Sequence, residues 1–92
     1  MTIEYSAAYN ALVDEMCVRL GFCGSVIDGE PSHVDFLLPE HGTVSAVAFA
    51  DLVFRAEGWD PDGVDALRFR RAIRNAFIRH MGTSEVDVSL LR

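Results

Sequence analysis

The fold is decided by residues 45–57, which read SAVAFADLVFRAE. At 100° per residue, apolar side chains cover nearly the whole circumference of this stretch, so it predicts a helix surrounded by other elements. The polar exceptions are Ser45 at its start, Glu57 at its end, and the pair Asp51 and Arg55. Asp51 and Arg55 lie four positions apart on one narrow strip and are expected to pair. Residues 44–57 therefore predict the buried central helix of the domain.

The boundaries of this helix carry ordinary capping signals. Thr43 or Ser45 can cap its start, and Gly58 is the expected left-handed residue just beyond its end. Upstream, residues 6–20 predict a first long helix that stops at Gly21. Its apolar side chains at helical spacing are Tyr5, Tyr9, Leu12, Val13, Met16 and Leu20, and Phe22 is expected to fold back onto the helix after the glycine.

Residues 61–81 predict the last long helix. Asp60 as N-cap followed by Pro61 is a usual helix start, but Gly63 indicates an irregular first turn and makes Asp65 the alternative beginning. The side chains expected on its core face are Phe69, Ala72, Ile73, Ala76 and Phe77, with His80 at its end.

Two short segments, residues 33–38 and 85–91, stay ambiguous. Each alternates apolar and other residues as a strand does, and each also contains a capping pattern typical of a helical turn. They are either helical turns or the two strands of one ribbon. The sequence as a whole predicts a mainly α fold: a single domain over residues 1–92, built as a compact bundle of three long helices.

The net charge of −6 is unevenly distributed. Residues 1–64 carry a net −9, whereas residues 65–81 carry a net +4 through five arginines and no lysine. An acidic body with one basic helix argues against general binding of nucleic acid or anionic membranes.

No stretch is long and apolar enough to span a membrane, and the N-terminal residues lack the pattern of a signal peptide. The chain is therefore expected to be cytoplasmic and bacterial.

The candidate metal ligands do not form a recognisable site. They are Cys17, Cys23, His33, His41 and His80, and none of them stands at a zinc-ligand spacing. The two cysteines are expected to be reduced, small buried side chains, and His80 is expected to be a partly buried, hydrogen-bonded residue at a helix end. We therefore expect no metal and no cofactor. Because no nucleophile is paired with a base in any local motif, we also expect no enzyme activity.

The most specific feature is one face of the last helix. Arg70, Arg71 and Arg74 project together there, with Leu67 and Ile78 among them. A run of charge is usually a solvated face, but bulky apolar residues among arginines are also typical of protein interfaces. These five residues are the predicted interaction surface. The sequence thus favours a non-catalytic protein–protein interaction or regulatory module that forms a homodimer. The alternative is a nucleic-acid-binding regulator that uses the Arg-rich helix, and a small enzyme ranks third.

Overall fold

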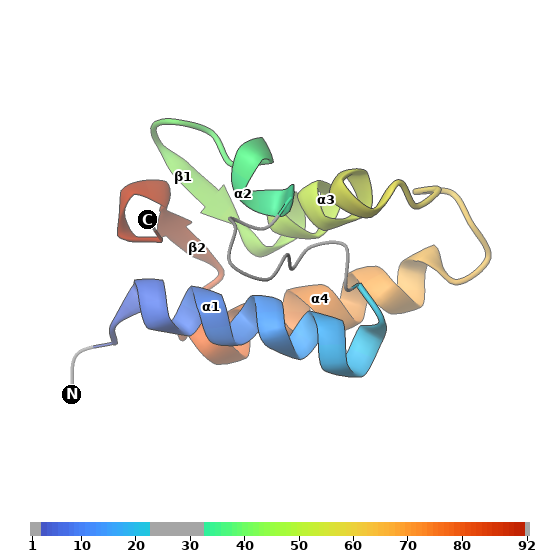
Figure 1. The fold of residues 1–92 in the computed structure, drawn as a ribbon, viewed down its shortest axis with the longest axis horizontal. Coiled ribbons are helices and arrows are strands. Elements are labelled where there is room, and N and C mark those ends of the chain that lie inside the picture. Colours follow the sequence, from blue (N-terminus) through green and yellow to red (C-terminus); the bar gives the residue numbers. More distant parts are fainter. Residues whose placement is uncertain (1–2, 23–32, 92) are drawn as a thin grey trace.

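The computed structural model describes residues 3–22 and 33–91. Its helices lie in two layers (Figure 1): α1 and α4 run side by side, and α2 and α3 cover them. A short antiparallel ribbon, β1 with β2, closes one end. The bounds of these elements are α1 (Tyr5–Glu15), α2 (His33–Leu37), β1 (Thr43–Ser45), α3 (Ala46–Glu57), α4 (Ala66–Met81) and β2 (Glu85–Asp87). The predicted mainly helical bundle is confirmed.

Helix α3 is the most buried element, as its sequence predicts. Its start is capped by Ser45, whose Oγ accepts a hydrogen bond from the Ala48 N–H at 3.1 Å, and it ends at Gly58 with φ of 70°. The side chains of α3 that are buried are Ala46, Phe49, Ala50, Leu52, Val53 and Phe54. One strip, through Val47, Asp51 and Arg55, stays at least partly accessible to solvent.

The first long helix extends over the predicted residues, but its last turn is not α-helical. Helix α1 continues directly into a π-helical turn, Met16–Leu20, which ends at Gly21 with φ of 77°. The Phe22 N–H then donates to the Met16 carbonyl oxygen at 3.2 Å, and the Phe22 ring is fully buried. The glycine thus turns the chain so that Phe22 enters the core, as predicted.

Cys17 lies in this π-helical turn and is disulfide-bonded. The expectation of a reduced thiol is therefore wrong for Cys17. That expectation rested on the cytoplasmic assignment, and the spacing of two cysteines does not by itself reveal whether they are oxidised. Cys23 lies outside the described residues.

The last long helix begins later than the predicted residue 61. Asp60 caps a tight turn, because its Oδ1 accepts from the Asp62 N–H at 2.9 Å, and the Gly63 N–H donates to the Asp60 carbonyl at 3.1 Å. A second turn follows, and α4 starts at Ala66 with Asp65 in the N-cap position. The alternative start at Asp65 is confirmed, whereas helix formation from Pro61 is wrong. The helix ends at Met81 as predicted.

The two ambiguous segments take different structures. Residues 33–37 form helix α2, because helical spacing places the buried Val34 and Leu38 together against α3. Residues 85–87 form strand β2, but its partner is β1, with Val44 opposite Val86. A ribbon between residues 33–38 and 85–91 is therefore wrong, since the residues just before α3 supply the pairing edge instead.

The C-terminal residues close the domain. After β2, Val88–Leu90 form a 3₁₀ turn that Asp87 caps, accepting from the Ser89 N–H at 2.9 Å. Hydrogen bonds from Ser89 hold the pKa of Asp87 below its usual value. The bond from the Ser89 backbone N–H has the larger effect, and the bond from the Ser89 side chain has the smaller one. Val88 is fully buried, and its N–H donates to the Gly42 carbonyl at 3.0 Å.

Aromatic rings pack in two groups, one of which includes the 39% exposed Trp59. At one end Phe49 of α3 lies between Tyr9 of α1 and Phe77 of α4, with ring centroids 6.1 and 5.3 Å away. At the other end Phe22, Phe54, Trp59 and Phe69 form a second group, with ring centroids between 4.8 and 6.3 Å apart. Because α3 contributes a ring to each group, it joins the two ends of the core.

Truncation of the Phe54 side chain should therefore strongly destabilise the folded protein. We expect Phe54→Ala to lower the free energy of unfolding by about 3–5 kcal/mol, because a large cavity replaces the buried ring. The melting temperature should fall by roughly 10 °C or more in a domain of this size. The matched control is Phe36→Ala on α2, where the ring is 73% exposed and its loss should change little. A melt shifted by only about a degree in Phe54→Ala would show that α3 is peripheral.

Candidate interaction surface

The five predicted surface residues do not form one uniform face. Arg71, Arg74 and Ile78 line a single groove along α4. Leu67 is 58% exposed but does not line that groove, and Arg70 is held against the core as described below. The structure therefore brings together three of the five predicted residues.

The groove has a volume of about 550 Å³ and runs between the start of α3 and the outer side of α4. Two exposed apolar side chains contribute to it, Val47 at 54% and Ile78 at 42% exposure. Its remaining lining residues are Ser45, Ala46, Arg71, Arg74, Asn75, Ser84 and Glu85. The sequence did not single out Val47, because a valine within an apolar helix is indistinguishable from a core residue until the neighbours are placed.

Arg70 is part of the packing between α3 and α4. Its guanidinium lies 4.8 Å from the centre of the Phe54 ring, and Nη1 pairs with the Asp51 carboxylate. The expected pair of Asp51 with Arg55 is therefore wrong: the partner of Asp51 comes from α4. An arginine stacked on a ring and paired with a carboxylate is held in one orientation, so Arg70 is poorly placed to serve an outside partner.

A second hollow of about 320 Å³ lies beside this ion pair. Its lining residues are Asp51, Phe54, Arg55, Trp59, Pro61 and Arg70. Val47, Asp51 and Arg55 are spaced four apart on α3, so the groove and the second hollow follow the same side of the helix. We call this side, with the groove and the second hollow, the α3–α4 face.

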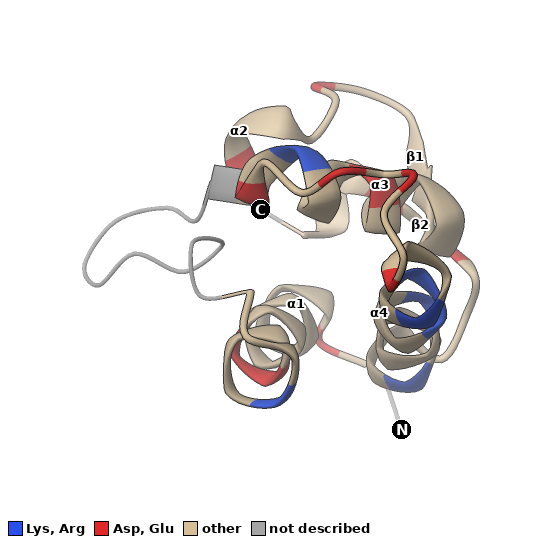
Figure 2. Ribbon diagram, turned by 90° about the vertical axis from the view of Figure 1, so that its right-hand side faces the viewer, with Lys and Arg blue, Asp and Glu red and all other residues tan. Residues whose placement is uncertain are grey.

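Most of the arginines of α4 are neutralised by acids of the same chain. Arg68 lies 3.5 Å from Asp65, Arg70 pairs with Asp51, and Arg79 pairs with Glu15. Figure 2 shows most of the basic positions along α4, with others on α3 and on the helical turn that continues α1, and the acidic positions spread over several elements and loops. Among the described residues, Arg71 and Arg74 are the members of this helix left without an ion pair, and both line the groove.

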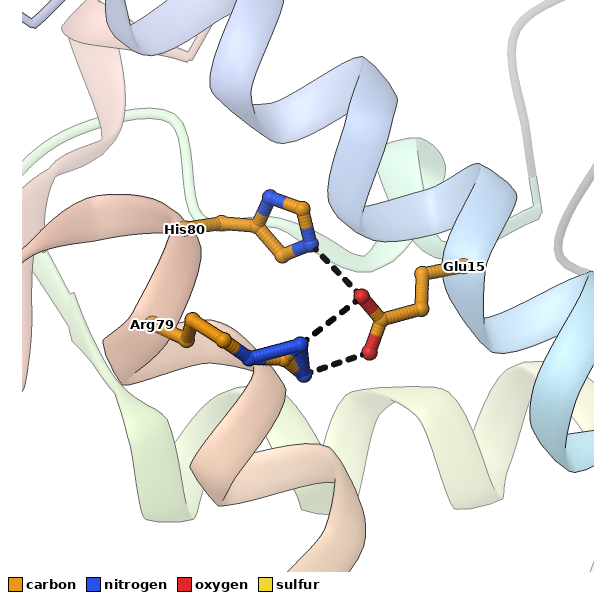
Figure 3. Close-up of polar contacts among 3 residues, drawn as sticks. All are labelled: Glu15, Arg79 and His80. Carbon is orange, nitrogen blue, oxygen red and sulfur yellow. Dashed lines mark hydrogen bonds and ion pairs between the residues drawn. The ribbon is translucent and has the colours of Figure 1, made fainter.

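Glu15 holds the far end of α4 against α1 (Figure 3). Arg79 donates to both carboxylate oxygens, with Nη1 to Oε1 at 3.0 Å and Nη2 to Oε2 at 2.5 Å. His80 Nε2 also lies 3.0 Å from Oε1, and its side chain is partly buried, as expected. Local sequence patterns cannot reveal this cluster, because its members lie more than 60 positions apart. Its geometry is that of a structural clamp between two helices.

Comparison with known proteins supplies no relative for this chain. No family model matches it, and neither does any curated protein or solved structure. Within residues 3–22 and 33–91, no group of three or more potential metal-ligating side chains occurs. No helix in that part of the chain has the length and apolar character needed to cross a membrane. The α3–α4 face is thus interpreted from its own geometry.

The clamp at Glu15 should make a measurable contribution to stability. A double-mutant cycle with Glu15→Gln and Arg79→Gln should give a coupling energy of about 0.5–1 kcal/mol, since the pair is bidentate but Arg79 is half exposed. The matched control cycle uses Asp65→Asn and Arg68→Gln, a more exposed single contact whose coupling should be near zero. Equal coupling in both cycles, measured by urea unfolding, would contradict the clamp.

Proposed function

We propose that this protein is a non-catalytic protein–protein interaction module and that the α3–α4 face is its contact surface. The observation that carries the proposal is the groove itself, where Arg71 and Arg74 have no ion pair within the described chain and flank the exposed Val47 and Ile78. Protein interfaces are enriched in this combination of arginine with apolar anchors.

The charges argue against the nucleic-acid alternative. The two groove arginines that have no ion pair within the described residues can neutralise about two phosphates, so log K should fall with log salt at a slope of only about −1.8. Specific DNA binders make several more contacts of this kind, and the acidic remainder of this chain would repel the phosphate backbone. A protein partner is therefore favoured over duplex DNA.

The groups that line the groove and the second hollow support binding rather than catalysis. Ser45 is engaged as a helix cap, and the Asp51 carboxylate is paired with Arg70. Among the described residues that line these two hollows there is no histidine and no cysteine. The described lining residues therefore do not supply the Ser–His or Cys–His pair that covalent catalysis commonly uses.

A cytoplasmic location stays part of the proposal, with one observation against it. Disulfides persist mainly in oxidising compartments, and Cys17 is disulfide-bonded. The proposal is tested through the partner of the module, which is either a second copy of the chain or another protein.

Two matched variants test the proposed function. Ile78→Asp places a charge in the groove, and Val18→Asp makes the same kind of change at an 84% exposed position outside the α3–α4 face. Quantitative affinity capture from the native cells, with solution mass measured in parallel, should show a partner or a second copy bound by wild type and Val18→Asp. Ile78→Asp should lose it while melting close to the wild-type temperature, because the position is on the surface. Retention by Ile78→Asp, or no partner with a monomeric wild type, would contradict the proposal.

A further inference from the structure

The chemistry of the groove defines what can fill it. Arg71 and Arg74 present two guanidinium groups without an ion pair among the described residues, and Glu85 is the acid that lines the same groove. Val47 and Ile78 supply the apolar part of its lining, one from α3 and the other from α4. The complement of such a surface is a segment that carries carboxylates beside a bulky apolar side chain.

We propose that the groove binds an acidic, amphipathic helical segment of a partner protein. The carboxylates of that segment pair with Arg71 and Arg74, and its apolar side chains pack against Val47 and Ile78. The inference rests on the proposed function, since it names the chemistry of the partner for the same surface. A helix suits the site because the seam between two neighbouring helices accepts a third one by the packing that helices use generally.

A second copy of the chain fits the groove less well. In a symmetric pair of antiparallel α4 helices, residues equidistant from the twofold axis face each other. An axis between Ala72 and Ile73 sets Leu67 against Ile78 of the second copy, which is favourable. The same axis sets Arg71 against Arg74 of the second copy, and two like charges that face each other directly repel. In such a homodimer, the favourable contact of Leu67 with Ile78 is therefore opposed by two repulsive arginine–arginine contacts at the centre of the interface.

The net charge of −6 does not prevent binding of an acidic segment. At physiological ionic strength the Debye length is about 8 Å, so exposed charges farther away than this are largely screened. The local charge of the groove, with Arg71 and Arg74 against Glu85, is positive. Attraction is therefore local to the groove, and it should weaken as salt is raised.

Peptide display against the folded protein tests the inference. The probe is a library of random peptides about 14 residues long, roughly four helical turns. Selection on the wild type should enrich sequences with Asp or Glu beside Leu, Ile or Phe at helical spacing. Arg71→Glu combined with Arg74→Glu should weaken the selected peptides at least about tenfold, since charge pairing turns into repulsion. The control, Arg19→Glu combined with Arg68→Glu, changes the net charge equally outside the groove and should bind as the wild type does.

The outcomes separate this inference from the proposed function. Selected peptides that lack acids, that bind the Arg71/Arg74 variant equally well, or that fail to emerge at all would overturn the acidic-segment inference. If affinity capture still yields a partner that Ile78→Asp loses, the interaction function stands without it. A stable dimer of the wild type that dissociates on Ile78→Asp would assign the groove to a second copy instead. Melting temperatures of all variants near that of the wild type establish that binding, and not folding, has changed.

Discussion

Burial of α3 is the constraint on which the rest of the structure depends. A chain of 92 residues has a small core, and α3 supplies rings to both of its aromatic groups through Phe49 and Phe54. Helices α2 and α4 pack directly on α3, and α1 reaches it through the contact of Tyr9 with Phe49. The other helices are thereby arranged around α3, and the ribbon of β1 with β2 holds the residues that lead into it.

This arrangement also determines which surface is left for a partner. Most of α3 is buried, and the side of it that borders the groove and the second hollow is the partly accessible strip through Val47, Asp51 and Arg55. Helix α4 lies beside that strip, and Arg70 crosses to it by pairing with Asp51 and stacking on Phe54. Acids of the chain neutralise Arg68, Arg70 and Arg79. The arginines of α4 that have no ion pair among residues 3–22 and 33–91 are therefore the two that line the groove. The position of the candidate site therefore follows from the packing of α3 and α4 in the core.

Much of the helical fold could be predicted because its signals are local. The helix at residues 44–57 is recognisable from its apolar circumference and its caps, and the stops at Gly21 and Gly82 follow from glycine in the left-handed conformation. The start of α4 was harder to predict, because Asp60 can cap either a helix or a tight turn. The hydrogen bond from the Gly63 N–H to the Asp60 carbonyl belongs to the tight turn. Strand pairing could not be predicted, since three-residue strands carry almost no pattern and their partner is set by tertiary contacts.

The candidate site was predicted in part, for a related reason. Helical spacing alone shows that Arg71, Arg74 and Ile78 share a face. Which arginines are neutralised depends on partners far away in the sequence, as with Arg70 and Asp51, and no periodicity reports such pairs. The disulfide state of Cys17 was not predicted because the expectation of a reduced thiol rested on the cytoplasmic assignment.

Native-state hydrogen exchange tests the central position of α3 most directly. The amides of residues 49–54 should be among the slowest in the protein and should exchange only through global unfolding. Their opening free energy should then equal that of unfolding measured with denaturant. Amides in the first turn of α1 and in the turns before α4 should exchange faster by local opening. If the amides of residues 49–54 opened at a free energy well below that of global unfolding, α3 would not be the element that holds the domain together.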